Sequence, residues 1–391
     1  MIPPDVPSPL VVVAGHICLD IIPVLAEEPD LRPGSLVEIG PASLSAGGPV
    51  GNVGLALHRL GVPVRLIGKT GDDVFGRVLL DVLRQRAPSL ADGMLVAAGE
   101  TTSYSVVISP PGVDRTFLHC PGANHTFGAA DVRCDRLRGA RVLHFGYPPV
   151  MRRFYADGGA ELHALMSDVR NCGLVTSLDV CQPDPHGESG RVDWAELLSR
   201  ALSAVDIFAP NVDELSVMLR GPGTPRPLDL GSLRELSGRA LAMGPGIVAL
   251  KLGDQGLYVR TSRDGAALER LCGVLGLDPA AWRGREVIAP CFRAARIAGT
   301  TGAGDCTIAG LLAALLRRED PVAAATAATA VGACSVEEPD ATSGVPRWPA
   351  VAARLAGGWP RHEPAPTLTA GGAWQRDARG TLSTPVVRET S

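Results

Sequence analysis

Short apolar runs alternate with amphipathic stretches over most of the chain. The runs are rich in Val, Ile and Leu, and we expect each of them to form a buried strand: 10–14, 64–68, 142–145, 174–179, 207–209 and 247–250. Between them, apolar residues recur at helical spacing, which predicts helices over 55–60, 74–83, 162–169, 194–200 and 233–243. Strands that alternate with helices form a mostly parallel sheet that is covered on both faces. The pattern therefore predicts an α/β fold whose ligands bind beyond the carboxyl ends of the strands.

Four segments depart from this pattern. Residues 21–45 and 101–118 alternate polar and apolar positions, contain Pro and Gly, and predict β-strands outside the main sheet, with an ordinary surface hairpin as the alternative. Residues 261–296 form a long connection with an expected helix at 267–275. Residues 347–391 are rich in Pro and Gly, show little apolar periodicity, and are expected to be a mobile tail.

Composition narrows the class of protein. The net charge is −4, and no Lys/Arg-rich block appears, so nucleic acid is not an expected partner. No apolar run is long enough to span a membrane, and the first residues lack the basic region of a signal peptide. The nine cysteines stand singly, without a Cys-x-x-Cys pair, which argues against a zinc site and a disulfide framework. We expect reduced thiols in a cytoplasmic protein.

Residues 298–305 carry the strongest chemical signal in the chain. Gly302, Ala303 and Gly304 lead into Asp305, and the apolar stretch that follows predicts a buried helix. The backbone N–H groups at a helix N-terminus and the helix dipole favour a phosphate or a developing anion. A carboxylate in the same turn can accept a proton from an attacking hydroxyl. The alternative is that Asp305 only caps the helix.

A second glycine-rich entry to a helix lies at residues 45–61, with Gly47, Gly48 and Asn52 ahead of a closing Leu-Gly pair. This stretch resembles the N-terminal signature of the PfkB (ribokinase-like) carbohydrate kinases, and residues 300–305 resemble the C-terminal signature of the same family. The resemblance extends over a kinase domain at residues 8–346. It implies a three-layer αβα sandwich with a small β lid from residues 21–45 and 101–118. It also implies transfer of the γ-phosphoryl group of ATP to a hydroxyl of a small sugar or sugar acid.

The resemblance assigns catalytic roles within the C-terminal signature. Asp305 would be the general base, and Gly302, Ala303 and Gly304 would form the anion hole for the migrating phosphoryl group. The chain contains no Gly-x-x-x-x-Gly-Lys-Ser/Thr loop, so a Walker-type phosphate site is not expected.

The nucleotide side is expected to combine three further stretches. Residues 210–214 resemble the Asn-x-x-Glu motif of the family, in which Glu214 would organise Mg²⁺ together with the phosphates of ATP, whereas a helix cap is the alternative. Residues 248–259 resemble the Leu-Gly-x-x-Gly segment beside the nucleotide, and a plain hairpin is the alternative. The predicted nucleotide-binding residues are Asn211, Lys251, Gly253, Gly256 and Thr301, although Lys251 is equally consistent with a solvated lysine.

The acceptor side follows from the first strand and the first signature. The family commonly has an Asp at the position of Asp20 that accepts hydrogen bonds from two substrate hydroxyls, and the alternative is a turn acid. Gly47, Gly48 and Asn52 would line the same site, and Asn124, in a Gly-Ala-Asn stretch, would reach the substrate. His16, His125 and His144 lie near motif ends and are interpreted as structural or substrate-contact residues rather than metal ligands.

Departures from the family pattern leave the specificity open. Gly299 stands where many members have an Asp that helps to hold a monovalent cation, so dependence on K⁺ is expected to be weak. Residues 179–184 replace the Asp-x-Asn-x-Arg pattern of several sugar kinases, so the wall that selects the substrate is expected to differ. A nucleoside kinase and a non-catalytic sugar-binding regulator remain alternatives, whereas a nicotinamide-dependent enzyme lacks its Gly-x-Gly-x-x-Gly turn. The resemblance also allows a homodimer through the lid.

Overall fold

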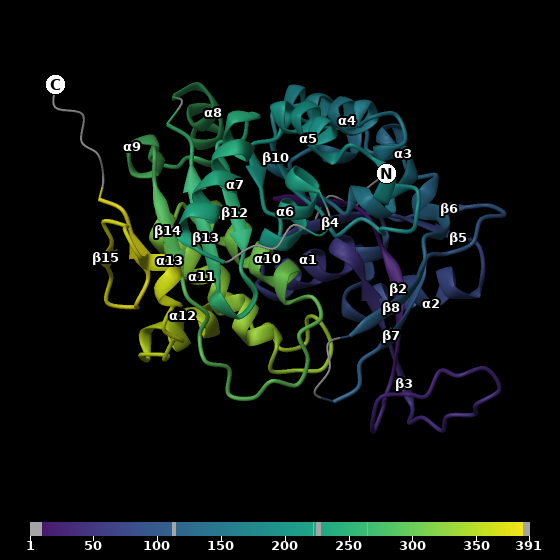
Figure 1. Cartoon of the computed structure of the whole chain (residues 1–391). Coiled ribbons are helices and arrows are strands. Elements are labelled where there is room, and N and C mark those ends of the chain that lie inside the picture. Colours follow the sequence, from purple (N-terminus) through teal and green to yellow (C-terminus); the bar gives the residue numbers. More distant parts are fainter. Residues whose placement is uncertain (1–9, 112–114, 222, 224–227, 264, 386–391) are drawn as a thin grey trace.

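A ten-stranded mixed sheet runs through the centre of the molecule (Figure 1). The computed structural model describes residues 10–111, 115–221, 223, 228–263 and 265–385. Six neighbouring strands run parallel, in the order β12, β11, β10, β9, β1 and β4. Their bounds are β1 Val11–Gly15, β4 Val64–Ile67, β9 Val142–Gly146, β10 Val175–Asp179, β11 Ile207–Phe208 and β12 Ile247–Lys251. All six apolar runs of the sequence are therefore strands of this sheet.

Four antiparallel strands extend the sheet beyond β12. They follow in the order β13, β14, β16 and β15, and each is antiparallel to the strand before it. Their bounds are β13 Leu257–Thr261, β14 Glu286–Ala289, β15 Gln375–Arg376 and β16 Leu382–Ser383. The long connection at 261–296 thus supplies β14 as well as two helices, α8 (Gly265–Leu275) and α9 (Pro279–Trp282).

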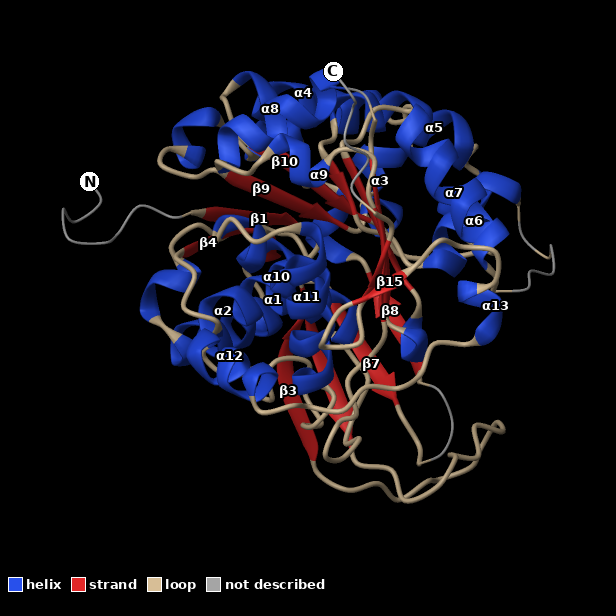
Figure 2. Ribbon diagram, turned by 90° about the vertical axis from the view of Figure 1, so that its left-hand side faces the viewer, coloured by secondary structure: helices blue, strands red, loops and turns tan. Residues whose placement is uncertain are grey.

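Helices cover both faces of the sheet (Figure 2). Alternate residues of β1 separate the two cores, because Val11 and Val13 pack with one layer while Val12 and Ala14 pack with the other. The first layer contains α1 Gly48–Arg59, α2 Val74–Arg86, α10 Ala303–Leu316 and α11 Pro321–Ser335. The second layer contains α4 Ala160–Asn171, α5 Trp194–Ala201, α6 Val212–Arg220 and α7 Leu230–Ala242. A short helix, α3 (Arg152–Tyr155), precedes α4. Burial on both faces explains why the strands read as unbroken apolar runs.

Helix α1 begins well before the predicted stretch 55–60, at Gly48. Glycines weaken a helix prediction, but here two of them permit close packing. A Cβ atom on Gly51 would lie 2.6 Å from the backbone oxygen of Ala46, and one on Gly54 would lie 2.3 Å from Leu66. The close approach to β3 and β4 therefore outweighs the low helix propensity.

A separate four-stranded sheet has the order β3-β2-β7-β8, and we refer to it below as the lid. Its strands are β2 Cys18–Pro23, β3 Ala42–Gly47, β7 Tyr104–Ile108 and β8 Thr116–Cys120. The predicted Pro-Pro-Gly turn before β8 lies partly outside the described residues, and two further strands, β5 (Lys69–Gly71) and β6 (Leu95–Ala97), pair beside the lid. Both segments that departed from the α/β pattern thus contribute to one sheet.

The C-terminal segment differs from the expectation of a mobile tail. It contains α12 (Trp348–Ala356), α13 (Pro366–Thr369) and the strands β15 and β16, which join the main sheet. Val351, Leu368 and Leu382 are buried. These apolar residues are isolated among Pro, Gly and charged residues, so the sequence shows no periodicity there although the segment packs on the sheet.

Two further observations concern the sequence expectations. Cys134 and Cys172 form a disulfide, whereas the single spacing of the cysteines favoured reduced thiols throughout. Among the described residues, none of the helices combines the length and the apolar character that crossing a membrane requires.

Candidate active site

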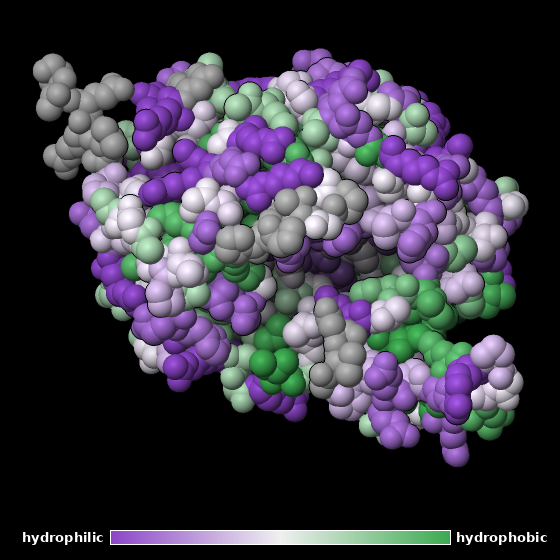
Figure 3. Space-filling view, in the orientation of Figure 1, coloured by the Kyte–Doolittle hydropathy of each residue, from purple (hydrophilic) through white to green (hydrophobic). Residues whose placement is uncertain are grey.

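Asp20 and the two glycine-rich signatures meet in one cleft at the carboxyl ends of the parallel strands. The other predicted nucleotide and metal residues, Asn211, Glu214, Lys251, Gly253 and Gly256, are not among the residues that line it. The cleft has a volume of 780 Å³ and lies between the main sheet and the lid. Figure 3 shows the molecular surface hollowed near the middle of this face. Among the predicted site residues, the lining includes Asp20, Gly48, Asn52, Thr301, Gly302 and Asp305. The acceptor motif and the C-terminal signature therefore face each other across one space.

Asp305 lies in the first turn of α10 and is 3% exposed. Each of its carboxylate oxygens accepts one hydrogen bond, from Asn52 Nδ2 to Oδ2 at 2.8 Å and from the hydroxyl of Tyr147 to Oδ1 at 3.0 Å. Burial raises the pKa of Asp305, while the charge of Lys251 and these two hydrogen bonds oppose the rise. Because a carboxylate oxygen has two lone-pair sites, the fixed carboxylate can accept a further proton from a ligand.

Gly302 turns the chain into helix α10. It has a φ of +72°, and α10 begins without a side-chain cap. A Cβ atom on Gly302 would lie 2.4 Å from the Cβ of Ala341, so glycine is required for both conformation and space. The hydrogen bonds of Asp305 go to Asn52 and Tyr147 rather than to the helix backbone, so the simple cap interpretation does not describe this residue.

The acceptor end of the cleft is built around Asp20. This residue lies on β2, is 5% exposed, and accepts a hydrogen bond from Cys18 Sγ at 3.3 Å. Burial raises the pKa of Asp20 to about 6, although hydrogen bonds from Cys18 and Ser105 lower it. A Cβ atom on Gly47 would lie 2.2 Å from Asp20 Oδ2, and one on Gly48 would lie 2.4 Å from His16 Nδ1. The glycine pair therefore leaves the space that both side chains occupy.

Asn124 lies elsewhere than the sequence predicted. Its Nδ2 donates to the backbone oxygen of Ile17 at 2.9 Å, and its Oδ1 accepts from the backbone N–H of Ile17 at 3.3 Å. Both ends of the amide are thus used on the chain between β1 and β2, and Asn124 is not among the residues that line the cleft. The amide of Asn124 therefore holds the chain at Ile17, and this geometry gives no support to the predicted substrate contact.

A buried charge cluster lies next to the first turn of α10. Lys251 Nζ contacts both carboxylate oxygens of Asp179, at 2.8 and 2.7 Å. Burial opposes its charge, yet Asp179, Glu214 and Asp305 raise the pKa of Lys251 above its usual value. A Cβ atom on Gly304 would lie 3.7 Å from Lys251 Nζ. Lys251 is therefore a buried cation beside the first turn of α10, not a solvated lysine.

Glu214 and Asn211 show the geometry of a helix cap. The backbone N–H of Asn211 donates to Glu214 Oε2 at 2.8 Å, and Asn211 Oδ1 accepts from the backbone N–H of Asp213 at 2.8 Å. Burial raises the pKa of Glu214, whereas the charge of Lys251 lowers it. The cap alternative is thus realised, and the same carboxylate still belongs to the charge cluster around Lys251.

The hairpin between β12 and β13 contains Gly253 and Gly256. Gly256 has a φ of +99°, and a Cβ atom there would lie 2.1 Å from the backbone oxygen of Ala289. The hairpin geometry alone therefore requires Gly256, and nucleotide contact by these two glycines stays a prediction.

Among the cleft residues that the sequence analysis did not mark are Tyr147 and His119. Tyr147 follows β9 directly and has a φ of +62°, which is rare for a non-glycine residue and marks functional sites. His119, on β8, lines the cleft and forms a hydrogen bond between Nδ1 and Ser105 Oγ at 3.0 Å. The end of a buried strand was the available signal for Tyr147, because ligands bind there. Of the three histidines that the sequence marked, His16 and His125 line the cleft, whereas His144 is buried against Ser177 at 2.9 Å.

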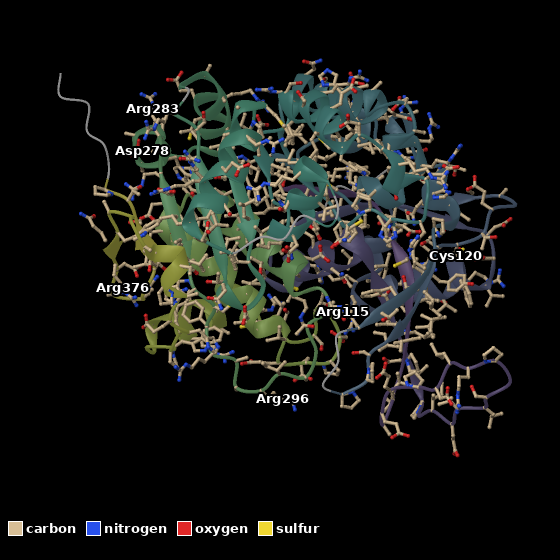
Figure 4. All side chains as sticks on the ribbon, viewed as in Figure 1. Arg115, Cys120, Asp278, Arg283, Arg296 and Arg376 are labelled. Carbon is tan, nitrogen blue, oxygen red and sulfur yellow. A yellow bond between two sulfur atoms is a disulfide. The ribbon has the colours of Figure 1, made fainter. Side chains whose placement is uncertain are left out.

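The lid also touches the loop before the anion hole. Arg115, which precedes β8, donates a hydrogen bond to Thr300 Oγ1. Figure 4 labels Arg115 near the mouth of the cleft. This contact links the lid to the segment that contains Thr301 and Gly302.

Comparisons with known proteins agree with this arrangement. The family described as pfkB family carbohydrate kinase matches residues 8–348. An uncharacterized sugar kinase of Archaeoglobus fulgidus is 26% identical over 293 residues, which cover 75% of this chain and 99% of that protein. A nucleoside kinase of Methanothermobacter thermautotrophicus is 26% identical over 333 residues, or 85% of this chain and 91% of that protein. The structure of ribokinase from Giardia lamblia superposes with a TM-score of 0.68 at 18% identity, covering 90% of this chain and 99% of the ribokinase.

Proposed function

Because the chain belongs to the pfkB family of carbohydrate kinases, we propose that its cleft transfers the γ-phosphoryl group of ATP to a hydroxyl of a small sugar or sugar acid, with Asp305 as general base. The observation that carries this assignment is the pair of hydrogen bonds that Asn52 and Tyr147 donate to Asp305, one on each oxygen. They hold a buried carboxylate beside the N-terminus of α10, where an acceptor hydroxyl and a phosphate can meet.

The transfer follows from this geometry. An acceptor hydroxyl donates its proton to a remaining lone pair of Asp305 while its oxygen bonds to the γ-phosphorus. The bond between that phosphorus and the β–γ bridging oxygen breaks, and ADP leaves with the electron pair. The backbone N–H groups of Gly302 and Gly304 would stabilise the charge of the transferring group, and Lys251 adds a buried positive charge beside them. The N–H group of Ala303 donates to the backbone oxygen of Thr300 at 3.3 Å and would have to exchange this bond to join them.

Glu214 is the residue that we propose for Mg²⁺, and Asp179 lies in the same charge cluster. The fit rests on their chemistry, because Mg²⁺ prefers hard oxygen ligands and needs only one or two carboxylates besides phosphates and water. Burial raises the pKa of Glu214, so a nearby cation would favour its ionised form. When bound, the ion would neutralise the phosphates of ATP. Asn211, Thr301 and the hairpin glycines are assigned to the nucleotide on the family resemblance.

The acceptor is assigned to Asp20, Gly47, Gly48 and Asn52. Asn52 serves both ends of the site, because its Nδ2 holds Asp305 while its buried Oδ1 has no partner among the described residues. A substrate hydroxyl would satisfy that oxygen, since buried polar atoms are nearly always hydrogen-bonded. Asp20 would accept from two further hydroxyls.

A nucleoside acceptor is the second candidate. Aromatic residues are scarce in the sequence, yet three of them, Phe117, Tyr147 and Tyr155, line this cleft. Aromatic side chains can stack on a base, so the cleft also offers a surface for a nucleoside. A relative described as a nucleoside kinase is consistent with this alternative.

The test is transfer of labelled phosphate from ATP to separate panels of neutral sugars, sugar acids and nucleosides. We expect turnover with a sugar or sugar acid, and Asp305→Asn should lower kcat by ~10²–10⁴-fold while ATP still binds, as for loss of a general base. Asp213→Asn is the matched control, because Asp213 is an exposed acid near the site. Turnover only with nucleosides would establish the second candidate, and a kcat for Asp305→Asn within twofold of the parent would remove Asp305 from the mechanism.

We also propose that the lid forms the interface of a homodimer. Its outer surface carries apolar side chains in the open, and Leu36 is 95% exposed. Figure 3 shows hydrophobic residues gathered at the lower right, over the lid. The exposed members are Val24, Leu31, Leu36, Val37, Ile39, Leu44 and Leu118. Exposed apolar patches of this kind mark protein interfaces. Sedimentation would compare the oligomeric state of Leu36→Asp with that of the parent, and a monomeric parent would contradict the proposal.

A further inference from the structure

Three side chains that commonly bind metals meet at the acceptor end of the cleft. His16 follows β1, Cys18 begins β2 and His119 lies on β8. One potential ligand atom from each residue lies within 4.8 Å of those from the other two. His16 and Cys18 are 5% and 2% exposed, and all three residues line the cleft. No sequence pattern groups these three residues, because β8 is brought near β2 only through β7 in the folded sheet.

Three of the four imidazole nitrogens of this cluster lack a hydrogen-bond partner among the described residues. Nδ1 and Nε2 of His16 and Nε2 of His119 are buried and have no hydrogen-bond partner among the described residues. Buried polar atoms are nearly always paired, so each unpaired one requires an explanation. The two rings face each other edge to face with centroids 5.1 Å apart. A single ion between them would use several of these atoms at once.

Hydrogen bonds behind the cluster orient its members. His119 Nδ1 lies 3.0 Å from Ser105 Oγ, and Ser105 Oγ donates to Cys18 Sγ at 3.7 Å. With the proton on His119 Nδ1, Nε2 keeps its lone pair, and the serine proton points to the sulfur. Partners of this kind fix the tautomer of a ligating histidine and stabilise a ligating thiolate. Asp20 lies next to the cluster, with Oδ1 at 3.3 Å from Cys18 Sγ.

We propose that His16, Cys18 and His119 bind a thiophilic divalent cation such as Zn²⁺ beside Asp20. Imidazole nitrogen and thiolate sulfur are ligands that Zn²⁺ takes, whereas Mg²⁺ prefers oxygen ligands alone. On binding, the metal–sulfur bond replaces the S–H bond of Cys18, and the proton leaves to solvent. An ion there lies next to Asp20, so it closes the acceptor end; this last step rests on the acceptor assignment proposed above.

Metal binding is tested on the full chain without substrate, with Co²⁺ as a spectroscopic probe. A cobalt–thiolate bond gives a charge-transfer absorption band in the near ultraviolet, which Zn²⁺ should abolish by displacement. The band should disappear in Cys18→Ser, and His119→Gln should weaken Co²⁺ binding by at least about tenfold, the loss typical of a damaged metal site. Cys120→Ser is the matched control, because Cys120 neighbours His119 on β8 but does not line the cleft (Figure 4). Thermal unfolding of each variant excludes loss of the fold.

Three results would overturn the site: no band in the parent, an undiminished band in Cys18→Ser, or loss of the band in Cys181→Ser, whose thiol also lines the cleft. Initial rates then test the closure. Zn²⁺ should inhibit competitively with the acceptor and not with ATP, and any other pattern contradicts the closure. The metal site and the proposed kinase activity can be refuted independently of each other. The cobalt spectrum is measured without turnover, and turnover is measured without zinc, so it does not depend on the metal cluster.

Discussion

Removing the hydroxyl of Tyr147 tests whether Asp305 is a base that its neighbours keep ionised. The hydroxyl donates to Asp305 Oδ1 at 3.0 Å, in a site where the carboxylate is 3% exposed. This hydrogen bond favours the charged form and therefore lowers the pKa of Asp305, against the rise that burial causes. Tyr147→Phe keeps the ring and removes only the donor. We expect the pKa of Asp305 to rise further in this variant.

The size of the effect follows from the kind of bond. A hydrogen bond to a charged group contributes about 1.5–3 kcal/mol, which is about 10- to 150-fold in the protonation equilibrium of the base. On the acidic limb of the pH profile, where activity requires the ionised carboxylate, kcat/KM should fall by that factor. At high pH Asp305 is ionised in both proteins, so the two rates should converge.

The assay is kcat/KM for the acceptor as a function of pH at saturating Mg²⁺ and ATP. Tyr155→Phe is the matched control, because Tyr155 also lines the cleft but, among the described residues, the hydrogen bonds of Asp305 go to Asn52 and Tyr147. Its profile should match that of the parent. If Tyr147→Phe lowers kcat/KM equally at every pH, the hydroxyl acts on positioning and the argument about the charge of Asp305 is refuted.

Two further predictions concern the two ends of the cleft. The KM for the substrate that accepts the phosphoryl group should rise as the pH falls through about 6, because protonated Asp20 can accept fewer hydrogen bonds from hydroxyls. Asp20→Asn should remove this pH dependence. A KM that is independent of pH in the parent would exclude Asp20 from binding hydroxyls. Glu214→Gln should shift the Mg²⁺ titration of the rate to higher concentration, since one carboxylate is lost, whereas Asp213→Asn, the exposed acid next to it, should leave the titration unchanged. If Glu214→Gln and the parent show the same Mg²⁺ titration of the rate, Glu214 does not organise Mg²⁺ and acts only in the helix cap.

The sequence predicted the parts of the site that lie in continuous motifs. Gly302 and Asp305 belong to one turn, so their chemistry could be inferred from local helix geometry. Tyr147 and Asn52, the two donors to Asp305, are 158 and 253 positions away from it. No local pattern encodes a contact over such a separation; the family motif pointed to Asn52, and Tyr147 had no motif.

Two expectations from the sequence differ from the structure for the same physical reason: the substrate contact of Asn124 and the mobile C-terminal tail. Asn124 lies in a stretch that the family uses near its substrate, yet the orientation of one amide decides whether it meets the ligand or the backbone of Ile17. In the C-terminal segment, Leu368 and Leu382 are buried by contact with distant parts of the fold, not by a repeating face. Tertiary contacts determine both outcomes, and a single sequence does not display them.

The two ends of the cleft differ in charge, and this difference orders the chemistry. At the nucleotide end, Asp179, Glu214 and Asp305 surround one cation, Lys251, so the site is short of positive charge before ATP arrives. At the acceptor end, burial lowers the pKa of His119 to about 4 and lowers that of His16 well below its usual value, so both rings are neutral near pH 7. We therefore expect a polyphosphate to need its own cation at the first end, whereas the second end combines the two neutral rings with the carboxylate of Asp20, which can accept hydrogen bonds from hydroxyls. The charge of Asp305 acts on both Lys251 and Asp20, so we expect the reacting hydroxyl to lie beside Asp305, between the two ends.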